Sequence, residues 1–148
     1  MRIRYSPARY SHIKELEAIN INAMPENYKH SFWALIISQH LSIVAKCNDV
    51  IIGYILMGKI DKEHNAVTII SLAVDSKFRG KGIGRTLLNS GIEKGRKIKK
   101  NGINLTVRIS NSIAIKLYKA NGFIEIETIA DYYKNPDEPG LCMIRNLG

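Results

Sequence analysis

The sequence predicts an α/β fold, a mixed sheet of the α+β kind with helices on its faces. Three observations support this prediction. Short apolar runs of strand length alternate with segments of helical periodicity. A glycine-rich turn separates one of these runs from the helix that follows it. The 148 residues, 45% hydrophobic and 24% charged, are enough for a single domain over residues 1–148 with a core of its own.

The predicted order of elements is β-α-α-β-β-β-α-β-α-β-β. In the N-terminal half, residues 2–5 form a short strand, and Ser6-Pro7 caps the first helix because proline is tolerated in a first turn. A loop at residues 24–28 precedes a second helix around Trp33. The strands that follow are residues 42–46, residues 50–59 and a run that ends near Asp75.

In the C-terminal half, the turn Arg79-Gly80-Lys81-Gly82-Ile83-Gly84 leads from the apolar run 69–74 into a helix. The helix shows apolar residues at helical spacing and stops at Asn101-Gly102. Asn111 is a typical N-cap for the next helix. The remaining predicted segments are a strand at 103–107, a strand at 123–129, a polar loop at 132–139 and a strand at 141–146.

The glycine-rich turn favours a phosphorylated cofactor. A strand, a turn and a helix in this order expose backbone N–H groups at a helix N-terminus, which attracts phosphate. The pattern is neither the dinucleotide fingerprint nor a Walker loop, since no Gly-Lys-Ser/Thr follows. From these residues alone, a tight turn in which glycines only supply positive φ stays open as the alternative.

Composition and charge exclude several function classes. The net charge is +9, and part of it is concentrated near a helix end. Three interpretations of these cations compete. The favoured one is that they complement the helix dipole. The others are that they attract a polyanion such as ribosomal RNA or aid capture of an anionic cofactor. No interleaved aromatics accompany them, so specific nucleic-acid recognition is not expected. The clustered residues are Lys94, Arg96, Lys97, Lys99 and Lys100.

The remaining composition predicts a cytoplasmic protein without a metal or a membrane span. Cys47 and Cys142 stand alone and are expected to be reduced thiols. The four histidines are scattered, with no metal-ligand spacing. No window approaches 18 apolar residues, and the N-terminus has no long apolar stretch typical of a signal peptide.

Two motifs resemble the GNAT superfamily of acyl-CoA N-acyltransferases. Arg79, Gly82 and Gly84 match that family's R/Q-x-x-G-x-G/A acyl-CoA motif after a strand. Residues 111–123 are similar to its N-x-x-A-x-x-L-Y-x-x-x-G-F segment. Two matches at the proper separation are much more specific than either alone, and the order of elements fits as well. The resemblance implies a GNAT fold and acetyl-CoA as cofactor, with CoA as product.

The resemblance covers nearly the whole chain and extends to protein N-terminal acetyltransferases. Met24-Pro25-Glu26-Asn27-Tyr28 resembles the substrate loop of the NatA catalytic subunit. Residues 107–111 resemble RimI and its relatives, and Tyr132-Tyr133-Lys134 resembles a tyrosine pair over the peptide N-terminus. This implies direct transfer of acetyl to the α-amine of protein N-termini, ribosomal or nascent chains among them, in a ternary complex. An auxiliary subunit is compatible with the resemblance but is not required.

The resemblance also implies which residues bind the cofactor. Backbone N–H groups of the glycine turn cradle the pyrophosphate, and the amide-rich pantetheine arm pairs with the strand residues 72–74. A backbone N–H there, that of Val74, is expected to polarise the thioester carbonyl. The expected cofactor-binding residues are Leu72, Ala73, Val74, Arg79, Gly80, Lys81, Gly82, Ile83, Gly84, Arg85, Asn111 and Tyr118.

For catalysis, Tyr118 matches the family's general acid, which protonates the leaving thiolate. The base is where this chain departs from its relatives, because Thr106 and Thr68 occupy the usual base positions. We therefore expect Glu26 to remove the amine proton through a water held by one of these threonines. The expected substrate-binding residues are Pro25, Glu26, Tyr28, Tyr132 and Tyr133.

Two alternatives remain open from the sequence. The first is an N-acetyltransferase for a lysine side chain or a small amine, which needs the same chemistry in another pocket. The second is an acetyl-CoA-binding module without catalysis, which the missing usual bases favour and Tyr118 disfavours. The preferred first residue of the substrate and the oligomeric state are not predicted by any motif.

Overall fold

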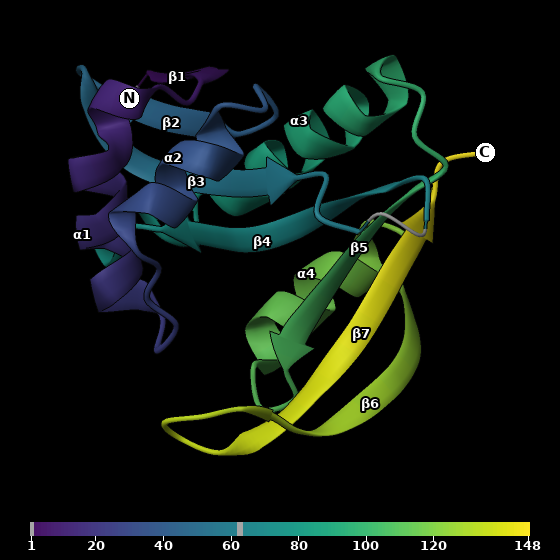
Figure 1. Ribbon diagram of the computed structural model, residues 1–148. Coiled ribbons are helices and arrows are strands. Elements are labelled where there is room, and N and C mark those ends of the chain that lie inside the picture. Colours follow the sequence, from purple (N-terminus) through teal and green to yellow (C-terminus); the bar gives the residue numbers. More distant parts are fainter. Residues whose placement is uncertain (1, 62–63) are drawn as a thin grey trace.

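A seven-stranded sheet forms the centre of the protein in the computed structural model, which describes residues 2–61 and 64–148 (Figure 1). The strands lie in the order β1-β2-β3-β4-β5-β7-β6. Neighbouring strands are antiparallel except β4 and β5, which are parallel, so the sheet is mixed as predicted. The strands are β1 (Ile3–Pro7), β2 (Ile43–Cys47), β3 (Val50–Gly58), β4 (Ala66–Val74), β5 (Gly102–Arg108), β6 (Ile124–Tyr133) and β7 (Glu138–Asn146).

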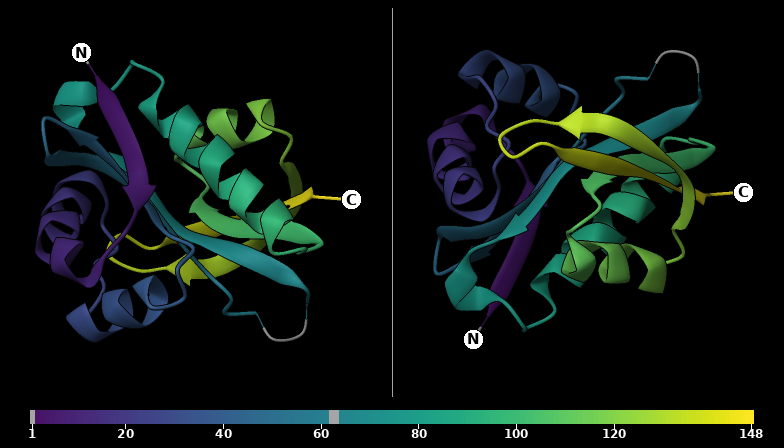
Figure 2. Two further views of the ribbon diagram at one scale, coloured as in Figure 1. Left: turned by 90° about the horizontal axis from the view of Figure 1, so that it is seen from above. Right: turned by 90° about the horizontal axis from the view of Figure 1, so that it is seen from below.

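Helices cover both faces of this sheet, as two views at right angles to the first show (Figure 2). One face carries α1 (Ile13–Ala23) and α2 (His30–Ile37), and the opposite face carries α3 (Ile83–Lys97) and α4 (Ser112–Ala120). Two 3₁₀ turns, η1 (Tyr10–His12) and η2 (Ser76–Phe78), precede α1 and α3. The predicted order of strands and helices is therefore confirmed, and the 3₁₀ turns are additional.

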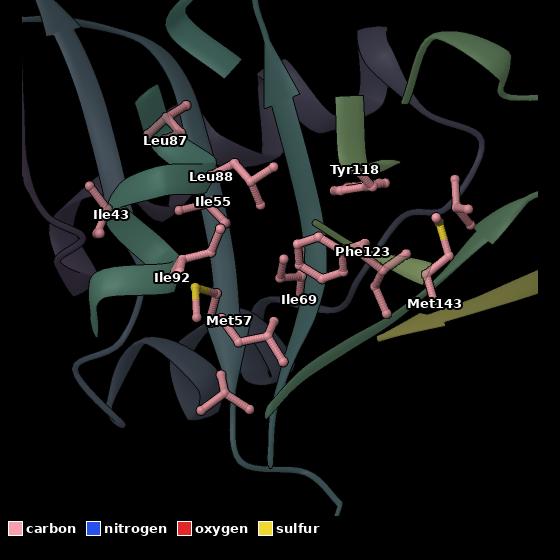
Figure 3. Packing of buried hydrophobic residues seen from close by; sticks show 14 of the residues in the cluster. Ile43, Ile55, Met57, Ile69, Leu87, Leu88, Ile92, Tyr118, Phe123 and Met143 are labelled. Atoms are coloured by element: carbon pink, nitrogen blue, oxygen red, sulfur yellow. The ribbon is translucent and has the colours of Figure 1, made fainter. Parts of the chain in front are cut away.

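Two hydrophobic clusters, one on each face, hold these layers together by removing apolar surface from water. In the larger cluster, Leu87, Leu88 and Ile92 of α3 pack on strand residues such as Ile55 and Met57 (Figure 3). The helix lies very close to the sheet at Gly91, where a Cβ atom would stand 2.6 Å from the Met57 sulfur. Glycine at that position therefore allows the close approach.

The only parallel pair in the described sheet is also the shortest. β4 and β5 are paired only from Ala66 to Thr68 and from Gly102 to Asn104. Beyond Thr68, β4 continues beside β3, and β5 continues beside β7. The carboxyl-terminal halves of the two strands therefore separate, which leaves unpaired backbone groups and an opening in the middle of the sheet.

Two local predictions were wrong. Ser6 and Pro7 are not a helix cap: both lie in β1, and α1 begins only at Ile13. Proline fits there because β1 is an edge strand, where a missing N–H costs no ladder hydrogen bond. The predicted loop 132–139 is shorter, because Tyr132 and Tyr133 belong to β6 and Glu138 begins β7. Irregular register between Ile129 and Tyr133 lets β6 continue through this polar stretch.

Candidate active site

Two adjoining cavities lie where β4 and β5 separate. The larger, about 560 Å³, is bounded by the end of β4 and the first turns of α3 and α4. The smaller, about 130 Å³, is bounded by the α1–α2 loop, β4, β5 and the end of β6. Because six residues line both, the cavities meet between them. These are Ala23, Met24, Leu72, Asn111, Ala114 and Tyr118.

Nearly all of the residues predicted to bind the cofactor line the larger cavity. They are Leu72, Ala73, Val74, Arg79, Gly80, Gly82, Ile83, Gly84, Arg85, Asn111 and Tyr118. Lys81 is exposed and does not line it. Leu117, the leucine of the matched segment 111–123, also lines the cavity, as do Phe78 and Ile113, which no sequence pattern singled out.

The glycine turn has the backbone of an anion cradle. Gly80 and Gly82 have φ values of 77° and 79°, which residues with a Cβ rarely adopt. No atom lies within 4 Å of the Cβ position at either residue, so the space above the turn is open. Gly82 is the N-cap of α3, whose first N–H groups have no partner within the helix. These features fit a phosphate group.

The backbone of β4 offers donors to the opening. The Asp75 N–H donates to the Ile52 carbonyl of β3 at 2.7 Å. Since N–H groups alternate along a strand, those of Val74 and Leu72 point away from β3, toward the opening. Leu72 lines both cavities, whereas Val74 lines only the larger of the two, and its carbonyl accepts from Arg79 Nε at 3.2 Å. The Leu72 N–H is therefore a candidate donor beside the predicted one on Val74, and it belongs to a residue that lines both cavities.

Tyr118 lies at the join of the cavities. Its side chain comes from α4, is 6% exposed and packs on the ring of Phe123 at 5.6 Å between centroids. Burial raises the pKa of the phenol, with a smaller contribution from Tyr54, so the hydroxyl keeps its proton through the neutral and alkaline range. Within the described residues its hydroxyl makes no recorded hydrogen bond, which leaves it free to donate into the site.

Glu26 lines the smaller cavity but is held by a buried cation. Arg108, at the end of β5 and 8% exposed, donates from Nε to Glu26 Oε1 at 2.8 Å, and its Nη2 lies 2.7 Å from the same oxygen. The carboxylate of Glu26 is therefore fixed in place, with its second oxygen available to the cavity.

The same guanidinium anchors the β6–β7 turn. Arg108 donates to the carbonyls of Pro136 and Lys134 at 2.7 and 2.9 Å and to Glu138 Oε1 at 3.0 Å, and it lies 4.6 Å from the centroid of the Tyr133 ring. Burial alone would lower the pKa of Arg108, but hydrogen bonds to Glu138 and Glu26 outweigh it and raise that pKa. The hydrogen bond from Arg108 in turn lowers the pKa of Glu138. Arg108 thus joins both walls of the smaller cavity.

The predicted substrate-binding residues do not all reach the cavity. Pro25, Glu26, Tyr28 and Tyr133 line it, whereas Tyr132 is 49% exposed and does not. The Tyr28 hydroxyl donates to the Ile70 carbonyl at 3.2 Å, and the Tyr133 hydroxyl donates to the Thr106 carbonyl at 2.8 Å. These bonds tie the α1–α2 loop to β4 and the β6 end to β5, which closes the cavity on two sides.

Of the two threonines at the usual base positions, only one can hold a water in the cavity. Thr106 lines the smaller cavity, with its hydroxyl 3.4 Å from Cys142 Sγ. Thr68 lies outside both cavities and donates to Asn104 Oδ1 at 2.6 Å, where β4 and β5 are still paired. Asn111 caps α4, accepting from the Ala114 N–H at 3.2 Å as its sequence position predicted.

Sequence reasoning missed two polar residues of the smaller cavity, Arg108 and Ser71. Arg108 follows the apolar residues of a strand, and its partner Glu26 is 82 residues away, so no local pattern reveals the pair. Ser71 lies within an apolar run and reads as a strand residue. Two signals could have drawn attention to Arg108: a charged residue at the buried end of a central strand, and its place within residues 107–111, which resemble RimI.

The chain belongs to the acetyltransferase (GNAT) family, whose model matches residues 10–123. It is 29% identical over 151 residues to an N-alpha-acetyltransferase of Sulfurisphaera tokodaii, an alignment that covers 91% of this chain and 88% of the relative. It is 31% identical to N-alpha-acetyltransferase 50 of Danio rerio, over 90% of this chain and 81% of the relative. A solved chain of the NatC complex bound to Gag peptide and CoA superposes with a TM-score of 0.92 and 27% identity, covering both chains fully.

The described residues contain neither a candidate metal centre nor a membrane-crossing helix. No group of three or more histidine, cysteine, aspartate or glutamate side chains there could hold a metal ion. Across residues 2–61 and 64–148, no helix has the length and apolar character needed to cross a membrane.

Proposed function

We propose that this protein transfers the acetyl group of acetyl-CoA to the N-terminal α-amine of proteins, by direct attack in a ternary complex. One observation carries the proposal: two cavities meet at a buried tyrosine hydroxyl, the larger with an anion cradle and the smaller with a fixed carboxylate. The names of the N-alpha-acetyltransferase relatives and the peptide and CoA in the NatC complex support the same reaction.

Acetyl-CoA fits the larger cavity. The N–H groups from Gly80 to Gly84 would hold the pyrophosphate, with Arg79 and Arg85 adding positive charge. The unpaired edge of β4 at residues 72–74 would pair with the pantetheine arm. When bound, acetyl-CoA supplies an acetyl group activated as a thioester.

Replacing a glycine of the turn tests cofactor binding without a measurement of enzyme turnover. We expect Gly82→Ala to weaken CoA binding about tenfold, because a Cβ is strained at φ 79° and occupies the space where phosphate would lie. Titration calorimetry with CoA measures this. Gly122→Ala is the matched control: Gly122 also has a positive φ, 88°, and lies outside both cavities. Equal affinity in Gly82→Ala and wild type would show that the turn does not hold the phosphates.

The chain's own groups can move the protons and stabilise the charge. A terminal α-amine has a pKa of about 8, so much of it carries an extra proton at neutral pH. Glu26 accepts that proton through a water at Thr106. The Leu72 N–H would donate to the thioester carbonyl oxygen, where negative charge develops when the amine attacks. Tyr118 would donate its proton to the sulfur that leaves, and the second proton that the nitrogen loses on becoming an amide would restore the Tyr118 hydroxyl.

Glu26→Gln tests the base. The amide keeps the shape and one oxygen for Arg108 but cannot take up a proton, so kcat/KM at pH 7 is expected to fall by roughly 10²-fold. Steady-state kinetics from pH 6 to 9 measure the effect. Glu93→Gln, an exposed carboxylate on α3, is the control. An unchanged pH profile in Glu26→Gln would assign the base elsewhere.

The reaction itself is tested with acetyl-CoA and a peptide library whose N-termini are either free or blocked, read by mass spectrometry. Acetylation confined to free N-termini supports the proposal. Acetylation at lysine side chains in blocked peptides overturns it in favour of a lysine acetyltransferase. No product with any peptide overturns it in favour of a binding module, provided that CoA still binds.

We further propose that the substrates include nascent and ribosomal proteins in the cytoplasm, and that the chain acts without an auxiliary subunit. Cys47 and Cys142 are both free thiols, which supports a reducing compartment. Both walls of the smaller cavity come from this one chain, which supports independent activity. Activity of the purified chain alone tests the second point.

A further inference from the structure

A chain of buried hydrogen bonds runs from α1 through the sheet to the smaller cavity. Asn20 Nδ2 donates to the Tyr54 hydroxyl at 3.1 Å, and that hydroxyl lies 2.7 Å from Ser71 Oγ. Ser71 in turn donates to Met24 Sδ at 3.3 Å. Asn20 and Tyr54 are each 1% exposed and Ser71 is 4% exposed, so water does not replace these contacts.

The chain has one direction. An amide nitrogen can only donate and a thioether sulfur can only accept, so when the single Ser71 proton goes to Met24, Tyr54 is the donor of its hydrogen bond with Ser71. The thioether sulfur of Met24 is a weak acceptor. A buried polar chain therefore ends on a donor whose present partner is poor.

Ser71 lines the cavity in which, on the proposed function, the first residue of a substrate would lie. Ser71 and Met24 line the smaller cavity together with Glu26 and Thr106. At about 130 Å³ this cavity is well below the roughly 300–1,000 Å³ of drug-sized ligand sites, so it suits an amine and a small side chain. Methionine is flexible and readily yields to a better acceptor.

We propose that the Ser71 hydroxyl donates to the side-chain oxygen of the substrate's first residue, so that the enzyme favours N-terminal serine and threonine over alanine and valine of similar shape. The inference rests on the proposed α-amine acetylation and adds its substrate class. When the substrate oxygen replaces the Met24 sulfur as the acceptor for Ser71, the complex is stabilised by the difference in strength between these two hydrogen bonds. A preference of about three- to tenfold in kcat/KM follows.

The experiment uses four peptides that differ only in the first residue: serine, alanine, threonine and valine. For the wild-type chain we expect serine over alanine, and threonine over valine, by about three- to tenfold in kcat/KM. Ser71→Ala should bring both ratios close to one, because the hydroxyl that favours serine and threonine is removed. Ser71→Thr keeps the hydroxyl and should retain the preference.

Two further variants test the direction of the chain. Met24→Leu conserves volume but removes the competing sulfur, so the serine-to-alanine ratio should rise or hold. Tyr54→Phe removes the donor that orients Ser71, so the ratio should fall part of the way to one. Thermal unfolding of each variant shows that a changed ratio does not reflect loss of folded protein.

The outcomes separate this inference from the reaction on which it rests. Equal ratios in wild type and Ser71→Ala overturn the role of Ser71 while leaving α-amine acetylation intact. An equal drop with all four peptides in Ser71→Ala also overturns it, since Ser71 would then serve the substrate backbone or the core. Absence of product with every peptide in the wild type counts against the proposed function instead.

Discussion

Tyr118→Phe is expected to lower kcat by about 10²-fold while leaving the affinity for CoA almost unchanged. Of the six residues shared by the two cavities, Tyr118 is the one with an acidic side chain, and burial keeps its phenol protonated. The ring fills the same space in phenylalanine, and among the described residues the hydroxyl has no recorded partner to lose. The variant should therefore fold as the wild type does, and its defect should appear in the chemical step.

Steady-state kinetics with a peptide and calorimetry with CoA measure the two quantities separately. Tyr10→Phe is the matched control, because Tyr10 is 65% exposed and lies outside both cavities. A wild-type kcat in Tyr118→Phe would mean that the leaving sulfur takes its proton from solvent.

Arg108→Met is expected to lower kcat/KM for the peptide by roughly 10²-fold, since a displacement of about 1 Å at a reacting group can cost that much. Methionine keeps the apolar bulk of the side chain, but Glu26, Glu138 and two turn carbonyls lose their donor. The affinity for CoA should hold, because Arg108 lines only the smaller of the two cavities. Arg108→Lys should recover little, since one ammonium cannot reproduce the planar fork.

A double-mutant cycle shows whether Arg108 acts through Glu26. In the Glu26→Gln background, Arg108→Met should cost much less than it does alone, since the carboxylate that it positions is already absent. Additive losses would instead assign to Arg108 a purely structural role at the β6–β7 turn.

The pH dependence of unfolding tests another contact of Arg108, its ion pair with Glu138. Arg108 lowers the pKa of Glu138 in the folded state, so the contact stabilises the protein above the usual carboxyl pKa near 4.5. That contribution is lost as pH falls from the usual carboxyl pKa through the lowered pKa of Glu138 in the folded state. Arg108→Met should therefore show a flatter stability profile between pH 5 and 3 in urea unfolding.

Features carried by neighbouring residues could be predicted from the sequence. The glycine turn requires two positive φ values, and the cap of α4 requires one short polar side chain, so each leaves a local signature. Tyr118 follows its cap at a spacing that the helix fixes. The order of the elements was predictable for the same reason, because helix and strand periodicity is read within a few residues.

Features that depend on distant residues could not be predicted in this way. The pair of Arg108 and Glu26 joins two positions 82 residues apart, and the contact of Ser71 with Met24 joins two that are 47 apart. The edge strand that accepts Pro7 is likewise defined by its partner β2 rather than by its own residues. Burial of a polar group is decided by the packing of the whole fold, so a single sequence does not reveal it.

The close contact at Gly91 joins the helix that carries the anion cradle to the hydrophobic core. A Cβ at Gly91 would stand 2.6 Å from the Met57 sulfur and 3.0 Å from Ile55 Cδ1, so glycine allows α3 to pack closely on the core. The anion cradle leads into this same helix, whose N-cap is Gly82. The opposite wall consists of a loop and a strand end joined by one guanidinium. Natural variants or engineered changes can therefore alter substrate choice in the loop wall without disturbing the part of the protein that recognises the acyl donor.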